Sequence, residues 1–152
     1  MKAFIFAAAA MFGAAYAGKA TIVNNCEYTV YAQSFPFAGG NRDLATIESK
    51  KSWSEDLIRD GNGDTIKVAK DASLSGPLFF AYSFSSNPNT IYYEMNSQWG
   101  NPFGDKHNIL STNKDCPALN CGANDAGCYS TPGNVKNPGC AEPADLTLTL
   151  CA

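Results

Sequence analysis

The stretch that decides the fold is Ala20-Thr-Ile-Val-Asn-Asn-Cys26, which is followed after one residue by Tyr28-Thr-Val-Tyr-Ala-Gln-Ser34. In the second segment Tyr28, Val30 and Ala32 alternate with more polar neighbours, and this alternation is typical of a strand with one buried face. The first segment has the composition of a short strand that ends at an Asn-Asn-Cys sequence. Two β-strands are therefore expected to open the folded part of the chain.

Six further short segments continue the same pattern, and no window of a dozen residues has a convincing helical apolar repeat. We expect these strands at residues 46–48, 51–56, 65–69, 78–84, 91–95 and 145–151. About eight short strands separated by Gly, Pro, Asn and Asp indicate an all-β sandwich or barrel. Residues 96–143 are rich in Gly, Pro, Asn and Cys, so we expect a loop region held by its own disulfides rather than by a core.

The first seventeen residues have the features of a secretory signal peptide. Lys2 gives a positive start, Ala3–Ala15 is apolar, and Ala15-Tyr16-Ala17 provides small residues for cleavage after Ala17. The apolar run is too short for a membrane span, which needs roughly 20 residues. We therefore expect a signal peptide over 1–17, one domain over 18–152, no membrane span, and a location outside the cell or in its wall.

The charge balance argues against a nucleic-acid partner. The full chain has 11 basic and 14 acidic side chains, and loss of Lys2 with the signal peptide leaves 10 and 14, a net charge of −4. A mildly acidic domain without a basic stripe cannot neutralise many phosphates. We expect a monomeric domain that binds no nucleic acid and needs no cofactor.

The six cysteines indicate disulfides rather than a metal site. The number is even, no Cys-x-x-Cys pair occurs, and His107 is the sole histidine. Six cysteines allow 15 connectivities, and spacing does not choose among them. Asp60-Gly-Asn-Gly-Asp64 resembles the start of a calcium loop, but Thr65 and Asp71 stand where that loop needs Gly and Glu, so a hairpin turn explains it better.

The opening segments resemble those of thaumatin-like proteins, which begin with a strand ending in Val-Asn-Xaa-Cys and continue Tyr-Thr-Val-Trp. Further similar segments follow in the same order along the chain: Lys51-Ser-Trp53, Phe79-Phe-Ala-Tyr-Ser-Phe84, Tyr93-Glu-Met-Asn96 and Leu146-Thr-Leu-Thr-Leu-Cys151. The chain is most similar to small fungal members, the yeast-phase-specific secreted proteins and the conidial thaumatin-like antigens. The resemblance implies a thaumatin-like β-sandwich, reduced in size, with a disulfide-held loop region.

The resemblance also bears on the disulfides. Full-length members have sixteen cysteines and a disulfide-rich second domain, for which this chain has no room. In the family the terminal cysteine bonds the first one, which implies a Cys26–Cys151 pair here. The other four cysteines then have three possible arrangements, and we favour Cys116–Cys140 with Cys121–Cys128.

The hydrolytic activity of the family depends on a cleft lined by carboxylates, because glycoside hydrolysis needs two of them. Carried over by resemblance, one acidic position of the family falls on Tyr82, a second on Glu94, and a third at or beside Trp99. Only Glu94 keeps its charge, and it could equally be an ordinary outward-facing strand residue. Asp105 or Asp115 could substitute from the loop region, but no spacing argument places them there.

These observations predict a binding protein rather than an enzyme. Exposed aromatic rings beside amides suit sugar rings, and we place Tyr82, Glu94 and Trp99 in the binding cleft, with Glu94 as the sole catalytic candidate. The expected ligand is β-glucan or another cell-wall polysaccharide, or else a host surface protein. A weak endo-β-1,3-glucanase and an antifungal or host-interacting protein are the alternatives.

Overall fold

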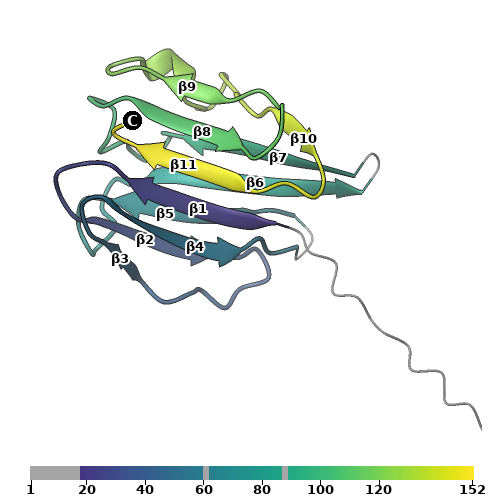
Figure 1. Ribbon diagram of the computed structural model, residues 1–152, viewed down its shortest axis with the longest axis horizontal. Coiled ribbons are helices and arrows are strands. Elements are labelled where there is room, and N and C mark those ends of the chain that lie inside the picture. Colours follow the sequence, from purple (N-terminus) through teal and green to yellow (C-terminus); the bar gives the residue numbers. More distant parts are fainter. Residues whose placement is uncertain (1–17, 60–61, 87–88) are drawn as a thin grey trace, which may run out of the picture.

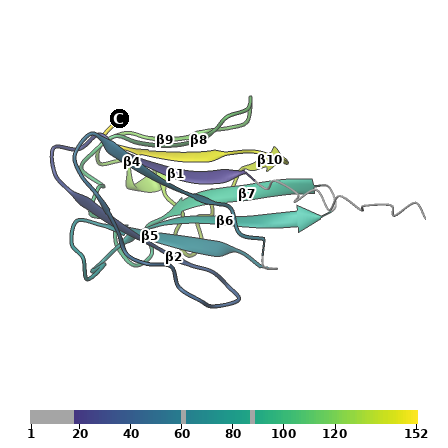
Figure 2. The same cartoon turned by 60° about the horizontal axis from the view of Figure 1, so that its bottom comes forward.

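The structure is a computed structural model that describes residues 18–59, 62–86 and 89–152. Two β-sheets lie face to face as two layers, which Figures 1 and 2 show from two directions. The predicted all-β sandwich is therefore confirmed. The predicted signal peptide over 1–17 lies outside the described residues. Within the described ranges no helix is long and apolar enough to cross a membrane.

Each sheet combines strands from distant parts of the chain. In order across the sheet, the five-stranded sheet contains β4 (Lys51–Asp56), β1 (Lys19–Asn24), β11 (Leu146–Leu150), β8 (Asn108–Thr112) and β9 (Leu119–Cys121). The six-stranded sheet contains β10 (Gly139–Ala141), β7 (Asn89–Asn96), β6 (Leu78–Ser86), β5 (Asp64–Ala69), β2 (Val30–Phe35) and β3 (Ala45–Ile47). All eight predicted strands are present, and none of their ends is displaced by more than two residues.

The prediction that residues 96–143 form a loop region without a core was wrong in part. This stretch supplies β8, β9 and β10, together with the short 3-10 turn η1 (Ala126–Cys128). Leu110 of β8 is fully buried, as are Phe103 and, almost completely, Tyr129. β8 could not be predicted from the sequence, because it is only five residues long and its partner β11 lies at the far end of the chain.

The core fills the space between the sheets with alternate residues of each strand. In β11 Leu146, Leu148 and Leu150 are buried, while the threonines between them are partly exposed. Leu78 and Phe80 of β6 face them from the other layer and are also fully buried. Burial of one such side chain contributes roughly 1.5–3 kcal/mol, so this alternation dominates the stability of the sandwich.

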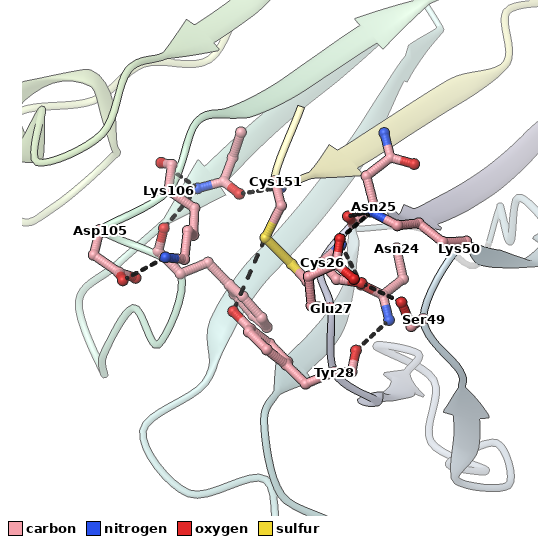
Figure 3. Close-up of a disulfide and its surroundings, with 12 residues drawn as sticks. Asn24, Asn25, Cys26, Glu27, Tyr28, Ser49, Lys50, Asp105, Lys106 and Cys151 are labelled. Carbon is pink, nitrogen blue, oxygen red and sulfur yellow. Dashed lines mark hydrogen bonds and ion pairs between the residues drawn. A yellow bond between two sulfur atoms is a disulfide. The ribbon is translucent and has the colours of Figure 1, made fainter.

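The two ends of the described chain meet because β1 and β11 pair in parallel, with Asn24 opposite Leu150. This register brings Cys26 and Cys151 together in a disulfide with a Cα–Cα distance of 5.1 Å, drawn in Figure 3. The buried Asn24 shapes the turn: its Nδ2 donates to the carbonyl oxygens of Tyr28 and Ile47 at 2.8 and 2.9 Å, and its Oδ1 accepts from the Cys26 amide at 3.0 Å.

The other disulfides are Cys116–Cys140 and Cys121–Cys128, which are the pairings that we favoured. The first joins the β8–β9 connection of one sheet to β10, which pairs with β7 in the other sheet. The second joins β9 to η1. The region that looked like a loop in the sequence is therefore cross-linked to both layers.

Candidate binding face

One solvent-facing surface of the sandwich is rich in rings. It consists of the outward side chains of β2, β5, β6 and β7, which we call the aromatic face: Gln33, Phe35, Thr65, Lys67, Phe79, Ala81, Ser83, Tyr92, Glu94 and Asn96. All of them are partly exposed, whereas their neighbours along each strand point into the core. This arrangement follows from the two-residue period of a strand.

The strand register sets two rows across this face. Phe35, Thr65, Ala81 and Glu94 are successive cross-strand partners in the first row. The second row is Gln33, Lys67, Phe79 and Asn96, listed in strand order. Cross-strand partners have Cβ atoms roughly 4.5–5.5 Å apart, so each row is a strip of neighbouring side chains.

Charged and polar groups lie among the rings. The Lys67 Nζ lies 4.1 Å from the centre of the Phe35 ring and 5.8 Å from that of Phe79, which is the arrangement of a cation–π contact. The Asn96 Nδ2 donates to Glu94 Oε1 at 3.2 Å. The face thus offers aromatic surfaces, amide groups, one cation and one carboxylate within two neighbouring rows.

A groove of about 270 Å³ lies on this face. Its lining includes the small residues Thr65, Ala81 and Ser83, and the larger side chains of Tyr92 and Glu94 on the adjacent strand. Asn137, from the connection that precedes β10, also lines it. Small side chains at the centre and larger ones beside them leave the hollow.

Two glycines shape the groove. Gly63 has a φ of +151°, and a Cβ there would lie 2.9 Å from the Tyr82 carbonyl oxygen. Gly139 is the cross-strand partner of Tyr92, and a Cβ there would lie 3.0 Å from the Tyr92 ring. The Tyr92 ring therefore packs over a position that has no side chain, which holds the ring in place at the groove.

Glu94 is the acidic residue of this face, and its directly opposite partner is Ala81. The side chains beside it on its own strand are Tyr92 and Asn96. Two-carboxylate hydrolysis needs a second acid across the bound sugar, and the aromatic face as defined by its described residues supplies one carboxylate. Its chemistry suits hydrogen bonding and ring stacking.

Tyr82 is placed differently from the cleft position that we predicted for it. Its side chain points into the core, and the residue is only 3% exposed. The hydroxyl accepts a hydrogen bond from the Ile58 amide at 3.0 Å, and burial raises the pKa of this hydroxyl above its ordinary value of 10.0. Its ring therefore cannot stack against a ligand on the side where Glu94 lies.

Trp99 lies in the turn that follows β7 and is 65% exposed. The Gly100 amide donates to the Ser97 carbonyl oxygen at 3.1 Å and closes this turn. Gly100 has a φ of +142° and packs directly on Gly76, because a Cβ there would lie 2.3 Å from the Gly76 carbonyl oxygen. The exposed Trp99 ring therefore follows shortly after Asn96, in the turn that comes after the strand of Glu94.

Several residues of the face were not among the predicted site residues. Tyr92 and Asn96 lie two positions from Glu94 on the same strand, so strand periodicity could have found them. Phe79 and Lys67 could not have been found in this way, because they depend on the register of two other strands. In the part of the chain that the structure describes, no three His, Cys, Asp or Glu side chains form a group that could hold a metal ion.

The sequence comparison agrees with this fold. Residues 7–152 match the family described as "Bys1: Blastomyces yeast-phase-specific protein". The chain belongs to the Bys1 family. No curated protein matches it at the level required for similarity.

Solved structures place this Bys1-family chain among thaumatin-like folds. It is similar to the crystal structure of the protein elicitor MoHrip2 from Magnaporthe oryzae, with 47% identity, a TM-score of 0.84, and coverage of 90% of this chain and 100% of that one. It is also similar in fold to the thaumatin-like xylanase inhibitor TLXI, with 19% identity, a TM-score of 0.61, and coverage of 88% and 99%. The resemblance to small fungal thaumatin-like proteins is therefore confirmed.

Proposed function

We propose that this Bys1-family protein is secreted and acts outside the cell as a non-catalytic binding protein, with cell-wall β-glucan as its ligand. The ligand lies on the aromatic face, where Phe35, Phe79 and Tyr92 offer rings and Asn96 and Glu94 offer hydrogen-bonding groups. The observation that carries the proposal is a groove of about 270 Å³ on this face, whose lining includes Tyr92 and Glu94. Trp99 extends the surface beyond the end of β7.

Secretion is supported by two independent features. The first seventeen residues have the signal-peptide pattern, and all six cysteines are paired in disulfides. Disulfides persist in oxidising compartments and are rare in the cytosol. A Cys26–Cys151 bond that closes the chain is expected to form after export.

Binding is favoured over hydrolysis by the distribution of carboxylates. Glu94 and Asp64 both contribute to the groove lining. Asp64, however, is only 1% exposed, and its Oδ1 accepts a hydrogen bond from the Phe37 amide. A glucanase would need two carboxylates that flank the bound sugar. Reducing-sugar release from laminarin that disappears in Glu94→Gln would support the weak endo-β-1,3-glucanase instead.

A pull-down on insoluble β-1,3-glucan tests the proposal with the mature chain. Trp99→Ala and Tyr92→Ala should each weaken binding by about tenfold, the loss of about 1.4 kcal/mol of stacking and contact energy. Leu44→Ala is the matched control, because Leu44 is an exposed apolar residue outside the aromatic face. Equal binding by all four proteins, or none by the wild type, excludes β-glucan binding through this face.

A second candidate function is host recognition of the elicitor type, through a host surface protein. The supporting observation is the 47% identity with a protein described as an elicitor over the whole of that chain. The purified protein applied to plant leaf tissue should trigger an oxidative burst, and a reduced and unfolded sample should not. Trp99→Ala separates the two functions: loss of glucan binding with a full burst would show that the host reads another surface.

A further inference from the structure

A second polar cluster lies inside the sandwich, away from the aromatic face. Its central residue is Glu55 of β4, which is the cross-strand partner of Ala20. Ala20 belongs to the core, so Glu55 points toward the opposite sheet rather than to solvent. One of its oxygens, Oε1, is shut off from solvent. An edge strand thus directs a carboxyl group into the space between the layers.

The six-stranded sheet presents three buried polar side chains in the same region. Ser34 is 0% exposed, Asp64 is 1% exposed and Tyr82 is 3% exposed. Asp64 Oδ1 accepts from the Phe37 amide at 2.9 Å, and the Tyr82 hydroxyl accepts from the Ile58 amide. The cluster therefore connects the six-stranded sheet to the backbone of two segments. One precedes β3 and contains Phe37, and the other follows β4 and contains Ile58.

Two buried oxygen atoms of the cluster, as far as the structure describes the chain, have no hydrogen-bond partner at normal distance. Within the described residues, neither Ser34 Oγ nor Glu55 Oε1 makes a hydrogen bond of normal geometry, although both are fully buried atoms. An ionised carboxylate only accepts, whereas a protonated carboxyl also donates. A buried polar atom without a partner costs roughly 1–3 kcal/mol. The Ser34 hydroxyl can donate to the ionised carboxylate, whereas a protonated Glu55 would itself donate to the buried oxygen atoms around it.

Burial is the main reason why Glu55 holds its proton more tightly than an exposed glutamate does. Burial raises the pKa of Glu55 above its ordinary value of 4.5, the Ser34 hydroxyl and the Arg42 charge lower it, and the carboxylates of Asp64 and Asp56 raise it. The charge of Glu55 in turn contributes to the raised pKa of Tyr82. Asp56 is exposed and paired with Lys19, and Arg42 is exposed, so no cation is buried against Glu55 among the described residues.

We propose that Glu55 is an acid-dependent clamp between the two sheets: in its protonated form it donates a hydrogen bond into the Ser34–Asp64–Tyr82 cluster, and in its ionised form it weakens the contact. The clamp joins the edge strand β4 to the opposite sheet. It also supports the segment after β2, because Asp64 holds the Phe37 amide. The contact between β4 and the opposite sheet is therefore strongest in an acidic medium.

The direction of the pH dependence follows from linkage. The folded state binds the Glu55 proton more tightly than the unfolded state does, so its stabilising effect is complete below the ordinary pKa. The effect is lost as the pH rises through the raised pKa of the folded state. The contribution of Glu55 to the wild-type melting temperature should therefore decrease between pH 4.5 and pH 7.5.

The test compares the melting temperature of the mature protein with that of Glu55→Gln across this pH range. The amide keeps a donor at every pH, so the variant should lose most of the pH dependence and melt higher than the wild type at pH 7.5. Glu48→Gln is the matched control: Glu48 is exposed, and this variant should follow the wild-type curve. A wild-type slope in Glu55→Gln, or a lower melting temperature than wild type at pH 7.5, overturns the clamp.

A second measurement uses the unmodified protein and so does not depend on how the variant folds. A carbon-detected NMR titration of the carboxyl groups should give Glu55 a midpoint above the ordinary glutamate value of 4.5. Hydrogen exchange of the Phe37 amide should accelerate as Glu55 ionises. A Glu55 midpoint at or below 4.5 overturns the proposal.

Discussion

The two outer surfaces of the sandwich differ sharply in composition. The five-stranded sheet presents what we call the Ser/Thr face. Besides the charged pair Lys19 and Asp56, its outward residues on β4, β1, β11 and β8 are Ser52, Ser54, Thr21, Val23, Thr147, Thr149, Ile109 and Ser111. None of these carries a ring, and small or β-branched side chains are all that a solvated sheet needs. The aromatic face has more rings than that, which is why we propose that the ligand binds on the six-stranded sheet.

The two sheets also differ in what holds the chain together. The five-stranded sheet contains the first and last strands, β1 and β11, which pair with each other. The Cys26–Cys151 disulfide links the chain just after the ends of these two strands. The six-stranded sheet has the groove. Changes in the first sheet should therefore alter stability, and changes on the aromatic face should alter binding.

The largest expected effect is on stability. Removal of the terminal disulfide by Cys26→Ser with Cys151→Ser frees a loop with a sequence separation of 125. The chain-entropy relation gives a loss of about 5 kcal/mol in the free energy of unfolding. Urea unfolding at 25 °C measures this loss, and the fraction that stays folded should bind β-glucan as the wild type does.

The comparison variant is Cys121→Ser with Cys128→Ser, whose sequence separation is 7. The same relation gives it a loss of about 2.5 kcal/mol. Equal losses for the two variants would contradict the loop-length argument. A weaker affinity of the folded Cys26/Cys151 variant would contradict the division between a stabilising sheet and a binding sheet.

The second-largest expected effect is on the affinity for β-glucan, and it is tested by giving one face the composition of the other. Phe79→Thr with Tyr92→Thr gives the aromatic face the composition of the Ser/Thr face. Affinity for laminari-oligosaccharides, measured by calorimetry, should fall about a hundredfold, the loss of about 2.7 kcal/mol. The free energy of unfolding should fall by only about 1–2 kcal/mol, because both rings are partly exposed.

Val23→Thr with Ile109→Thr is the matched control for this prediction. It replaces two partly exposed apolar side chains on the Ser/Thr face with the more polar threonine. A similar loss of stability with unchanged affinity is the expected result. If the control weakens binding as much as the ring variant does, the two faces are equivalent and the ligand does not distinguish them.

The strands could be predicted from the sequence. The face of the sheet on which each side chain lies could be predicted for only some of their residues. Alternation placed all eight predicted strands within two residues. Motif similarity assigned Tyr82 and Glu94 to one cleft, yet Glu94 pairs with Ala81, the neighbour of Tyr82. A shift of one residue reverses the face on which a side chain lies. The register between β6 and β7 decides whether Tyr82 and Glu94 lie on the same face.

Contacts between distant segments were also beyond the sequence. β8 is buried by β11, which lies more than thirty residues later. The acidic Glu55 lies in a strand with exposed neighbours, and nothing local shows that it faces Ser34 and Asp64 of the other sheet. Periodicity describes one strand at a time, so packing between layers stays invisible to it.

A smaller effect tests the groove itself. Ala81→Leu adds a branched side chain at the groove lining, where it should lower the affinity for laminari-oligosaccharides about tenfold, a loss of about 1.4 kcal/mol. Stability should change little, because Ala81 faces solvent. Ala81→Ser has nearly the original volume and serves as the control. Undiminished affinity of Ala81→Leu would show that the ligand bypasses the groove.

The smallest expected effect distinguishes a neutral ligand from an acidic one. Lys67 lies over the Phe35 and Phe79 rings, so Lys67→Gln should reduce stability by about 0.5–1 kcal/mol through the lost cation–π contacts. A neutral glucan does not need this charge, and its affinity should change by less than about threefold, under 0.7 kcal/mol. Lys51→Gln on the exposed edge strand β4 removes an equal charge as the control. A much larger loss for Lys67→Gln alone, and one that grows at low salt, would identify an acidic polysaccharide as the ligand, because salt screens exposed charges.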